Sequence, residues 1–121
     1  MLLIDAANVV GSRPTGWWRD RAGAARTFVQ RVRDARADGR LFEPVVIVLE
    51  GQARRGAIEG ASGGVEVIHA VGEGDDTLAA LAGSSPPPVT LVTADRGLIE
   101  RTRRVGADHV GPRWLLERLD H

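Results

Sequence analysis

The chain has 121 residues, which is enough for one hydrophobic core and too few for two domains. It contains no cysteine, so disulfides and thiolate metal sites are excluded. All 16 basic residues are arginine, so the lysine of P-loop proteins, Schiff-base enzymes and phospho-acceptor receiver domains is missing. The longest apolar run, Val45 to Leu49, is too short for a membrane span, and no basic and apolar leader precedes the first strand-like residues. We therefore expect a cytoplasmic protein with no membrane partner.

The net charge is zero, but the charge is unevenly spread along the chain. Residues 13–40 carry eight arginines against three aspartates, a balance of +5. Residues 41–100 carry three arginines against nine acids, a balance of −6. A basic segment beside an acidic one suits an enzyme that holds cations and grips a polyanion, but solvated helix faces give the same pattern. The charge alone leaves both interpretations open.

The first third of the chain predicts a strand, a loop and a helix. Residues 2–4 form an apolar run that ends at Asp5, as in a buried strand. Residues 6–19 contain two glycines and a proline and predict a loop. A helix is expected to begin with Asp20 as its N-cap and to end at Gly39, because the apolar residues between them follow the spacing of one helix face.

The rest of the chain alternates short apolar runs with helical patterns. The further strands are expected at residues 45–49, 65–68, 89–92 and 109–110. The further helices are expected at residues 74–83, 98–106 and 111–119. Such alternation predicts a single α/β domain over residues 1–121, with a parallel sheet of about five strands and helices on both faces.

Carboxylates follow four consecutive predicted strands. They are Asp5 after the first strand, Glu50 after the second, Glu73, Asp75 and Asp76 after the third, and Asp95 after the fourth. Parallel α/β proteins bind ligands at the carboxyl ends of their strands, so these acids are expected at one edge of the sheet. Gathered carboxylates repel one another and raise one another's pKa values, and a divalent cation relieves that repulsion. Taken singly, Asp75 and Asp95 could instead cap helices, and Glu50 could simply be exposed.

The ligand types indicate which metal and which reaction to expect. Oxygen ligands without cysteine or histidine favour Mg²⁺ or Mn²⁺ over Zn²⁺. Such ions activate a water molecule and stabilise the leaving oxygen when a phosphodiester is hydrolysed.

Three motifs resemble the NYN domains of the PIN-like nuclease superfamily, and especially their YacP-like bacterial branch. Residues 3–10 (LIDAANVV) resemble the opening motif of that group, which has Asp and Asn at the positions of Asp5 and Asn8. Residues 74–78 (GDDTL) resemble its central acidic pair, and residues 92–98 (VTADRGL) resemble its later Thr/Ser-x-Asp-Arg motif. The order and spacing match over essentially the whole chain.

The resemblance implies a ribonuclease that depends on Mg²⁺ or Mn²⁺, with a three-layer α/β/α fold and strand order 3-2-1-4-5. It implies that Asp5, Asp76 and Asp95 bind metal, with Asp75 close behind and Glu50 as a further ligand. Asn8 would orient a ligand or bind substrate beside the catalytic carboxylates. The implied partner is RNA, together with the ribosome or an antitoxin-like protein.

Aromatic and basic side chains could contact the RNA. Trp17, Trp18 and Arg19 in the first loop could stack on unpaired bases and pair with a phosphate, although a tryptophan pair also commonly covers the edge of a core. The candidate phosphate contacts are Arg13, Arg19, Arg54, Arg55 and Arg96. Thr93 could hydrogen-bond a metal ligand or merely begin a helix.

Two other functions remain open from the sequence. A toxin nuclease held by an antitoxin would have the same residues. A degenerate RNA-binding module is disfavoured, because retained carboxylate repulsion would bring it nothing. A haloacid-dehalogenase-like phosphatase is disfavoured, because Ala7 stands where its second aspartate is needed.

Overall fold

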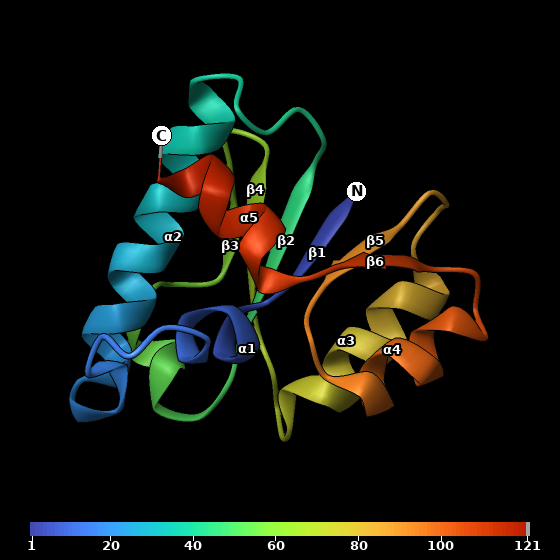
Figure 1. The fold of residues 1–121 in the computed structure, drawn as a ribbon, viewed down its shortest axis with the longest axis horizontal. Helices are drawn as coiled ribbons and strands as arrows, with labels where there is room; N and C mark the ends of the chain where they lie inside the picture. The colour runs from blue at the N-terminus through green and yellow to red at the C-terminus, as the bar shows by residue number, and fades with distance from the viewer. Residues whose placement is uncertain (121) are drawn as a thin grey trace.

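The computed structural model describes residues 1–120; His121 lies outside them. A six-stranded sheet is covered by helices on both faces, as Figure 1 shows. The strands are β1 (Leu2–Asp5), β2 (Val45–Leu49), β3 (Gly60–Ser62), β4 (Val65–His69), β5 (Thr90–Val92) and β6 (Asp108–Val110). The helices are α1 (Ala6–Gly11), α2 (Arg21–Ala37), α3 (Gly74–Ser84), α4 (Arg96–Arg103) and α5 (Pro112–Leu119), with 3-10 turns η1 (Trp17–Arg19) and η2 (Gly51–Gly56).

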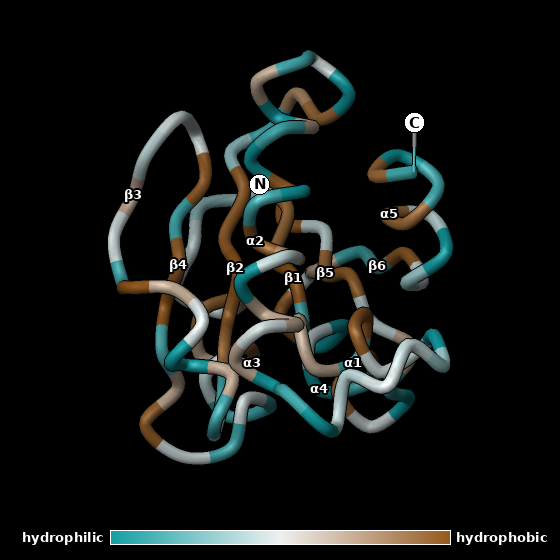
Figure 2. The backbone as a smooth tube through the Cα atoms, turned by 90° about the vertical axis from the view of Figure 1, so that its left-hand side faces the viewer, coloured by the Kyte–Doolittle hydropathy of each residue, from teal (hydrophilic) through white to brown (hydrophobic). Residues whose placement is uncertain are grey.

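The sheet has the strand order β3-β4-β2-β1-β5-β6, visible from left to right in Figure 2. All neighbouring pairs are parallel except β3 and β4. The five parallel strands thus have the predicted order 3-2-1-4-5, which places β1 between β2 and β5. The predicted three-layer α/β fold is confirmed.

Strand β3 was not predicted, because its three residues, glycine, alanine and serine, are small and exposed and form no apolar run. It pairs antiparallel with β4, with Gly60 opposite Val67 and Ser62 opposite Val65. The two-residue turn consists of Gly63 and Gly64, whose φ angles of 59° and 82° are left-handed. Such a turn matches the twist of a tight hairpin and strongly favours glycine.

Successive residues of the central strands enter two separate cores. Ile4 and Ile47 face one core, against α1, α2 and α5. Leu3 and Val46 face the other, against α3 and α4. The central strands are therefore apolar on both faces, as their uninterrupted sequence runs indicated. Within residues 1–120 no helix combines the length and the apolar character that crossing a membrane requires.

The first helical layer agrees with the sequence in one part and differs in another. Asp20 caps α2, accepting a hydrogen bond of 2.9 Å from the Gly23 amide, and Gly39 beyond its end has a φ of 79°. The loop expected at residues 6–19 is wrong in part, because α1 and η1 lie within it. Helix α1 begins directly at the end of β1, where Asp5 accepts a hydrogen bond from the Asn8 amide and Val9 is buried.

Turn η2 packs directly on the backbone of α2. A Cβ atom at Gly56 would lie 2.4 Å from the Ala22 carbonyl oxygen and 2.8 Å from both Ala25 Cβ and the Arg26 nitrogen. The obstructing atoms are mostly rigid backbone, so only glycine permits this approach. Gly56 therefore fixes how closely η2 and α2 meet.

We expect Gly56→Ala to lower the free energy of unfolding by about 2 kcal/mol or more, as overpacking does. Gly72→Ala is the matched control, because a Cβ there meets nothing within 4 Å. Urea denaturation of both variants measures the difference. Equal stability of the two would mean that the η2–α2 approach relaxes freely.

Candidate active site

The parallel strands bring the predicted acids to one edge of the sheet. Asp5 is the last residue of the central strand β1, opposite Val48 of β2. Glu50 follows β2 directly. Asp75 lies in the first turn of α3, after β4, and Asp95 caps α4, after β5. The side chains therefore come from four adjacent strands.

Asp5 is a buried carboxylate with two hydrogen bonds. Only 5% of the surface of Asp5 is exposed to solvent. The Thr93 hydroxyl donates to Oδ2 at 2.8 Å, and the Asn8 amide donates to Oδ1 at 3.3 Å. Burial raises the pKa of Asp5 to about 6, the two hydrogen bonds oppose that rise, and the charges of Asp75 and Glu50 add to it. The pKa of Asp5 thus records both its desolvation and the nearby acids.

Thr93 and Asn8 connect Asp5 to Asp95. The Thr93 hydroxyl oxygen accepts from the Asp95 amide at 3.2 Å, while the hydroxyl donates to Asp5. The Asn8 side-chain oxygen accepts from the Ala94 amide at 2.8 Å, which ties α1 to the segment after β5. Asp95 itself accepts from the Leu98 amide at 3.0 Å. Thr93, which the sequence left undecided, is therefore the bridge between the two carboxylates.

Glu50 is held by the beginning of α3. Its Oε2 accepts a hydrogen bond of 3.0 Å from the Gly74 amide, where the helix dipole favours a negative charge. A Cβ atom at Gly74 would lie 2.9 Å from Glu50 Oε1. Glycine at this position therefore leaves room for the Glu50 carboxylate.

The adjacent aspartates of α3 point to different surroundings. Burial raises the pKa of Asp75, and the charges of Asp95, Glu50 and Glu73 raise it further, against an opposing effect of Arg101. Asp76 is 73% exposed and accepts from Arg101 Nη1 at 3.1 Å. Asp75 is thus the member of the pair that shares its field with the other acids.

We call Asp5, Glu50, Asp75 and Asp95 the acidic cluster. Within residues 1–120 no group of three or more Asp, Glu or His side chains is placed so that the group could hold a metal ion. Mg²⁺ is commonly bound by one or two carboxylates, with water and substrate phosphate as its other ligands. The oxygen-only donor set, with a buried carboxylate at its centre, fits an ion bound in that open manner.

Some of the predicted RNA-contacting side chains are exposed to solvent, and others are hydrogen-bonded within the chain. Trp17 is half-buried and meets the exposed Trp18 edge-on, with ring centroids 6.0 Å apart. The Arg19 guanidinium lies 5.8 Å from the Trp18 ring. Arg96 is exposed at the first turn of α4, beside Asp95. These four side chains face solvent at least in part.

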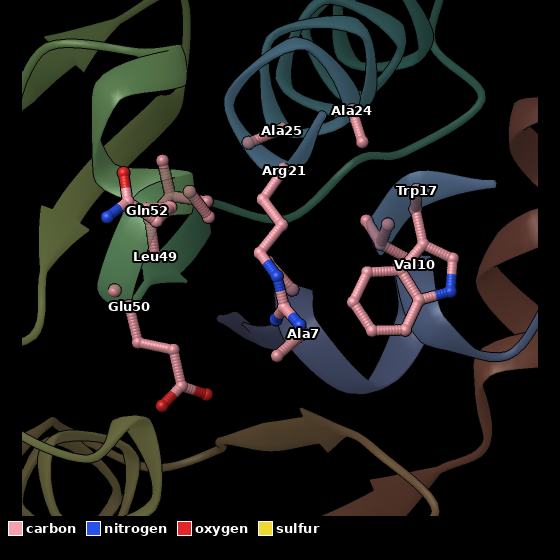
Figure 3. Close-up of a pocket in the computed structure, with 12 residues that line it drawn as sticks. Ala7, Val10, Trp17, Arg21, Ala24, Ala25, Leu49, Glu50 and Gln52 are labelled. Atoms are coloured by element: carbon pink, nitrogen blue, oxygen red, sulfur yellow. The ribbon is translucent and has the colours of Figure 1, made fainter. Parts of the chain in front are cut away.

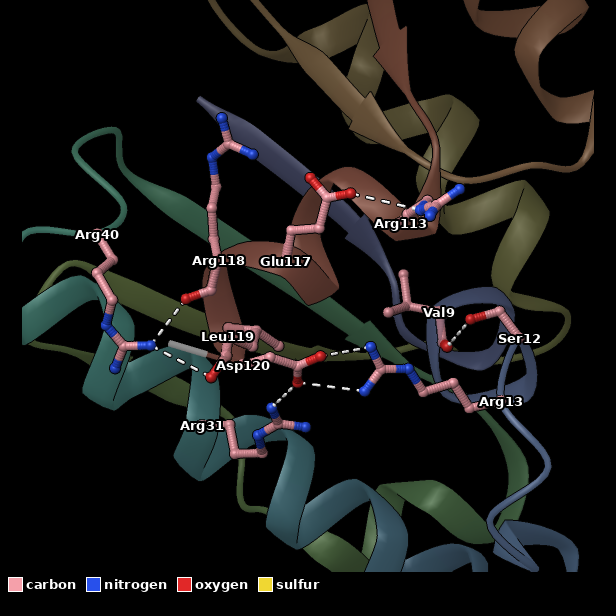
Figure 4. A network of polar contacts seen from close by, with 10 residues as sticks. All are labelled: Val9, Ser12, Arg13, Arg31, Arg40, Arg113, Glu117, Arg118, Leu119 and Asp120. Carbon is pink, nitrogen blue, oxygen red and sulfur yellow. Dashed lines mark hydrogen bonds and ion pairs between the residues drawn. The ribbon is translucent and has the colours of Figure 1, made fainter.

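Two of the predicted arginines are engaged within the chain. Arg13 pairs with Asp120 through both oxygens, at 3.2 and 2.5 Å, and Arg31 also donates to Asp120 (Figure 4). These arginines lower the pKa of Asp120 to about 2. Arg54 donates to the Gly51 carbonyl at 3.1 Å. Arg13 therefore ties α1 to the end of α5, which its sequence position did not indicate.

No family model and no curated protein matches the sequence. A crystal structure of Rae1 (YacP) from Bacillus subtilis, a tryptophan-to-leucine mutant, superposes with a TM-score of 0.75 at 20% identity, over 98% of this chain and 73% of that one. The chain has the fold of Rae1 (YacP). A second crystal structure of Rae1 gives a TM-score of 0.69 at 19% identity, over 99% and 73% of the two chains. The predicted resemblance to YacP-like proteins is thus confirmed at the level of the fold.

The buried charge of Asp5 makes stability depend on pH. A carboxyl group whose pKa rises on folding favours the folded state most at low pH, and that advantage is lost as the pH rises through the folded pKa. For Asp5 the rise runs from 3.8 to about 6. We expect the stability of Asp5→Asn relative to the unsubstituted chain to increase by about 2 kcal/mol between pH 4 and pH 8. Urea denaturation in EDTA measures it.

Asp108→Asn is the control for that comparison, because Asp108 is exposed on β6. Its effect on the free energy of unfolding should be nearly the same at both pH values. A flat difference for Asp5→Asn as well would show that the Asp5 charge is not penalised by folding.

Thr93→Val tests the bridge between Asp5 and Asp95. Valine keeps the volume of the side chain but removes the hydroxyl, so we expect a loss of about 2 kcal/mol at pH 8, where Asp5 is ionised. Thr102→Val is the matched control: both threonines are 1% exposed, but the Thr102 hydroxyl donates only to carbonyls of its own helix. The control should lose about 1 kcal/mol and show no pH dependence. Identical pH-independent losses would contradict the bridging role.

Proposed function

We propose that this chain is a ribonuclease that hydrolyses phosphodiester bonds of RNA and depends on Mg²⁺ or Mn²⁺. The observation that supports this most directly is the acidic cluster around Asp5. A folded chain keeps a carboxylate with a pKa of about 6 at the middle of its sheet edge, although burying that charge costs stability. A bound cation would stabilise the ionised form of this carboxylate and would also bind the substrate phosphate. The motifs at residues 3–10, 74–78 and 92–98 support the same assignment.

Asp5 and Asp75 are the two ligands we propose for the metal, with Asp95 and Glu50 at the border of the site. Asp75 is chosen over Asp76 because its pKa responds to Asp95 and Glu50, whereas Asp76 pairs with Arg101. When bound, the ion supplies a water molecule with a lowered pKa and charge stabilisation at the leaving oxygen. Mg²⁺ keeps open positions for phosphate oxygens, which suits a cluster that is not a closed cage.

The surrounding residues have separate tasks in this proposal. Thr93 and Asn8 are positioning residues, because their hydrogen bonds fix Asp5 and the segment that carries Asp95. Arg96, which adjoins Asp95, and Arg19 and Arg55 are exposed, and they would contact RNA phosphates. Arg13 is assigned a structural task instead, because its guanidinium is bound by Asp120.

We propose RNA as the partner and the cytoplasm as the location of this chain, with the ribosome as a further partner.

A second candidate function is an RNA-binding module without catalysis. The observation in its favour is that, in residues 1–120, no group of three or more acidic or histidine side chains could hold a metal ion. The two functions differ in metal binding. A metal that binds the folded chain raises its melting temperature, whereas a module without a metal site shows no rise specific to the acidic cluster.

We expect Asp75→Asn to reduce Mn²⁺-dependent cleavage of a single-stranded RNA by about a hundredfold, because a ligand is lost. Asp76→Asn is the matched control from the same helix turn; it removes only an exposed ion pair, so its cleavage rate should stay within about threefold. Both rates are measured under single-turnover conditions, together with the Mn²⁺-dependent rise in melting temperature. The opposite ranking would assign the metal to Asp76. RNA binding without cleavage or metal-dependent stabilisation in the unsubstituted chain would favour the second candidate.

A further inference from the structure

A pocket of about 340 Å³ lies beside the acidic cluster, between α1, the beginning of α2 and η2. Figure 3 shows its residues. Most of its lining is apolar and small: Ala6, Ala7, Val10, Ala24, Ala25, Leu49 and Ala53. Its polar groups are Arg21, Glu50 and Gln52. A mostly apolar pocket with few polar groups is the usual form of a site for a small organic group.

Trp17 and Arg21 give the pocket a π-stacking wall. The Arg21 guanidinium carbon lies 4.9 Å from the centre of the Trp17 ring. In Figure 3 the Arg21 side chain extends between Trp17 and Glu50, toward Ala7. Within residues 1–120 its recorded partner is this aromatic ring, and no carboxylate forms an ion pair with it. An indole and a guanidinium plane are the groups on which proteins stack unpaired bases.

The pocket and the acidic cluster share a wall. Glu50 belongs to both, and its carboxylate is held at the Gly74 amide. Ala6 and Ala7, which line the pocket, follow Asp5 directly in α1. A group that fills the pocket therefore lies next to any phosphate held at the cluster. The occupant has to belong to the same molecule as that phosphate, or compete with it.

We propose that this pocket takes one unstacked nucleobase of a single-stranded RNA, adjacent to the phosphate that is cleaved. This inference rests on the proposed function, because it names the form of RNA that the site accepts. A volume of about 340 Å³ has room for one base and its ribose but not for a duplex. The alanines receive the ring, Arg21 stacks on it with Trp17 behind the guanidinium, and Gln52 and Glu50 lie at the polar side of the pocket.

The test is an NMR titration of the chain with each of the four nucleoside 5′-monophosphates in EDTA, without any divalent metal. We expect the amide signals of Ala7, Ala24 and Gln52 to shift with at least one of them. Ribose 5-phosphate serves as the probe without a base, and it should leave those signals in place. Equal shifts with ribose 5-phosphate, or no shifts at millimolar nucleotide, would overturn the proposal.

Ala24→Leu fills the pocket without removing a core residue, because Ala24 is only partly buried. We expect it to weaken nucleotide binding about tenfold or more, in line with the loss of one stacking site. Ala37→Leu is the matched control: it makes the same substitution at an exposed position of the same helix and should bind as the unsubstituted chain does. Similar affinities for both variants would contradict the proposed pocket.

Arg21→Lys provides a variant that keeps the charge and does not touch the core. Lysine lacks the guanidinium plane, so nucleotide binding should weaken while the low affinity for ribose 5-phosphate stays unchanged. Because these measurements use neither metal nor cleavage, they separate two failures. Nucleotide binding in a chain that never cleaves RNA would contradict the proposed function and support the proposed pocket. Cleavage of RNA by a chain whose pocket binds no nucleotide would support the proposed function and contradict the proposed pocket.

Discussion

The hydrogen bond from the Thr93 hydroxyl to the Asp5 carboxylate is the interaction on which the site depends. It crosses from the end of β5 to the end of β1, and among residues 1–120 no other side chain bonds both the buried carboxylate and the Asp95 amide. Without it, Asp5 would be a desolvated charge with one weak partner, and the protein would favour its neutral form still more strongly. A polar residue that is 1% exposed thus keeps the ionised acid compatible with a packed sheet.

Glu50 makes two parts of the molecule one functional unit. Its carboxylate contributes to the field that raises the pKa of Asp5, and its side chain also forms one wall of the pocket. It holds these positions because Gly74 brings the first amide of α3 close to it. Gly56 lets η2, which forms one side of the pocket, approach α2 directly. Gly74, at the start of a predicted motif, and Gly56, outside the motifs, therefore shape the surroundings of Glu50 and the pocket.

The sequence predicted the features that depend on local pattern. The central strands were visible as apolar runs, and Asp95 was recognisable as a helix cap because a cap bonds within its own first turn. The side-chain directions of Asp75 and Asp76 were not predictable, since adjacent residues on a helix point about 100° apart and the pattern does not fix which one faces the sheet. The ion pair of Arg13 was invisible as well, because Asp120 is 107 residues away.

The internal engagement of several arginines affects how the protein would respond to ionic strength. Arg13, Arg54 and Arg101 each donate to groups within the chain, so they have little capacity left for a polyanion. Binding that relies on few phosphate contacts releases few condensed counterions. Affinity for RNA would then fall only gently as buffer concentration rises, and discrimination would come from the shape of the strand rather than from its charge.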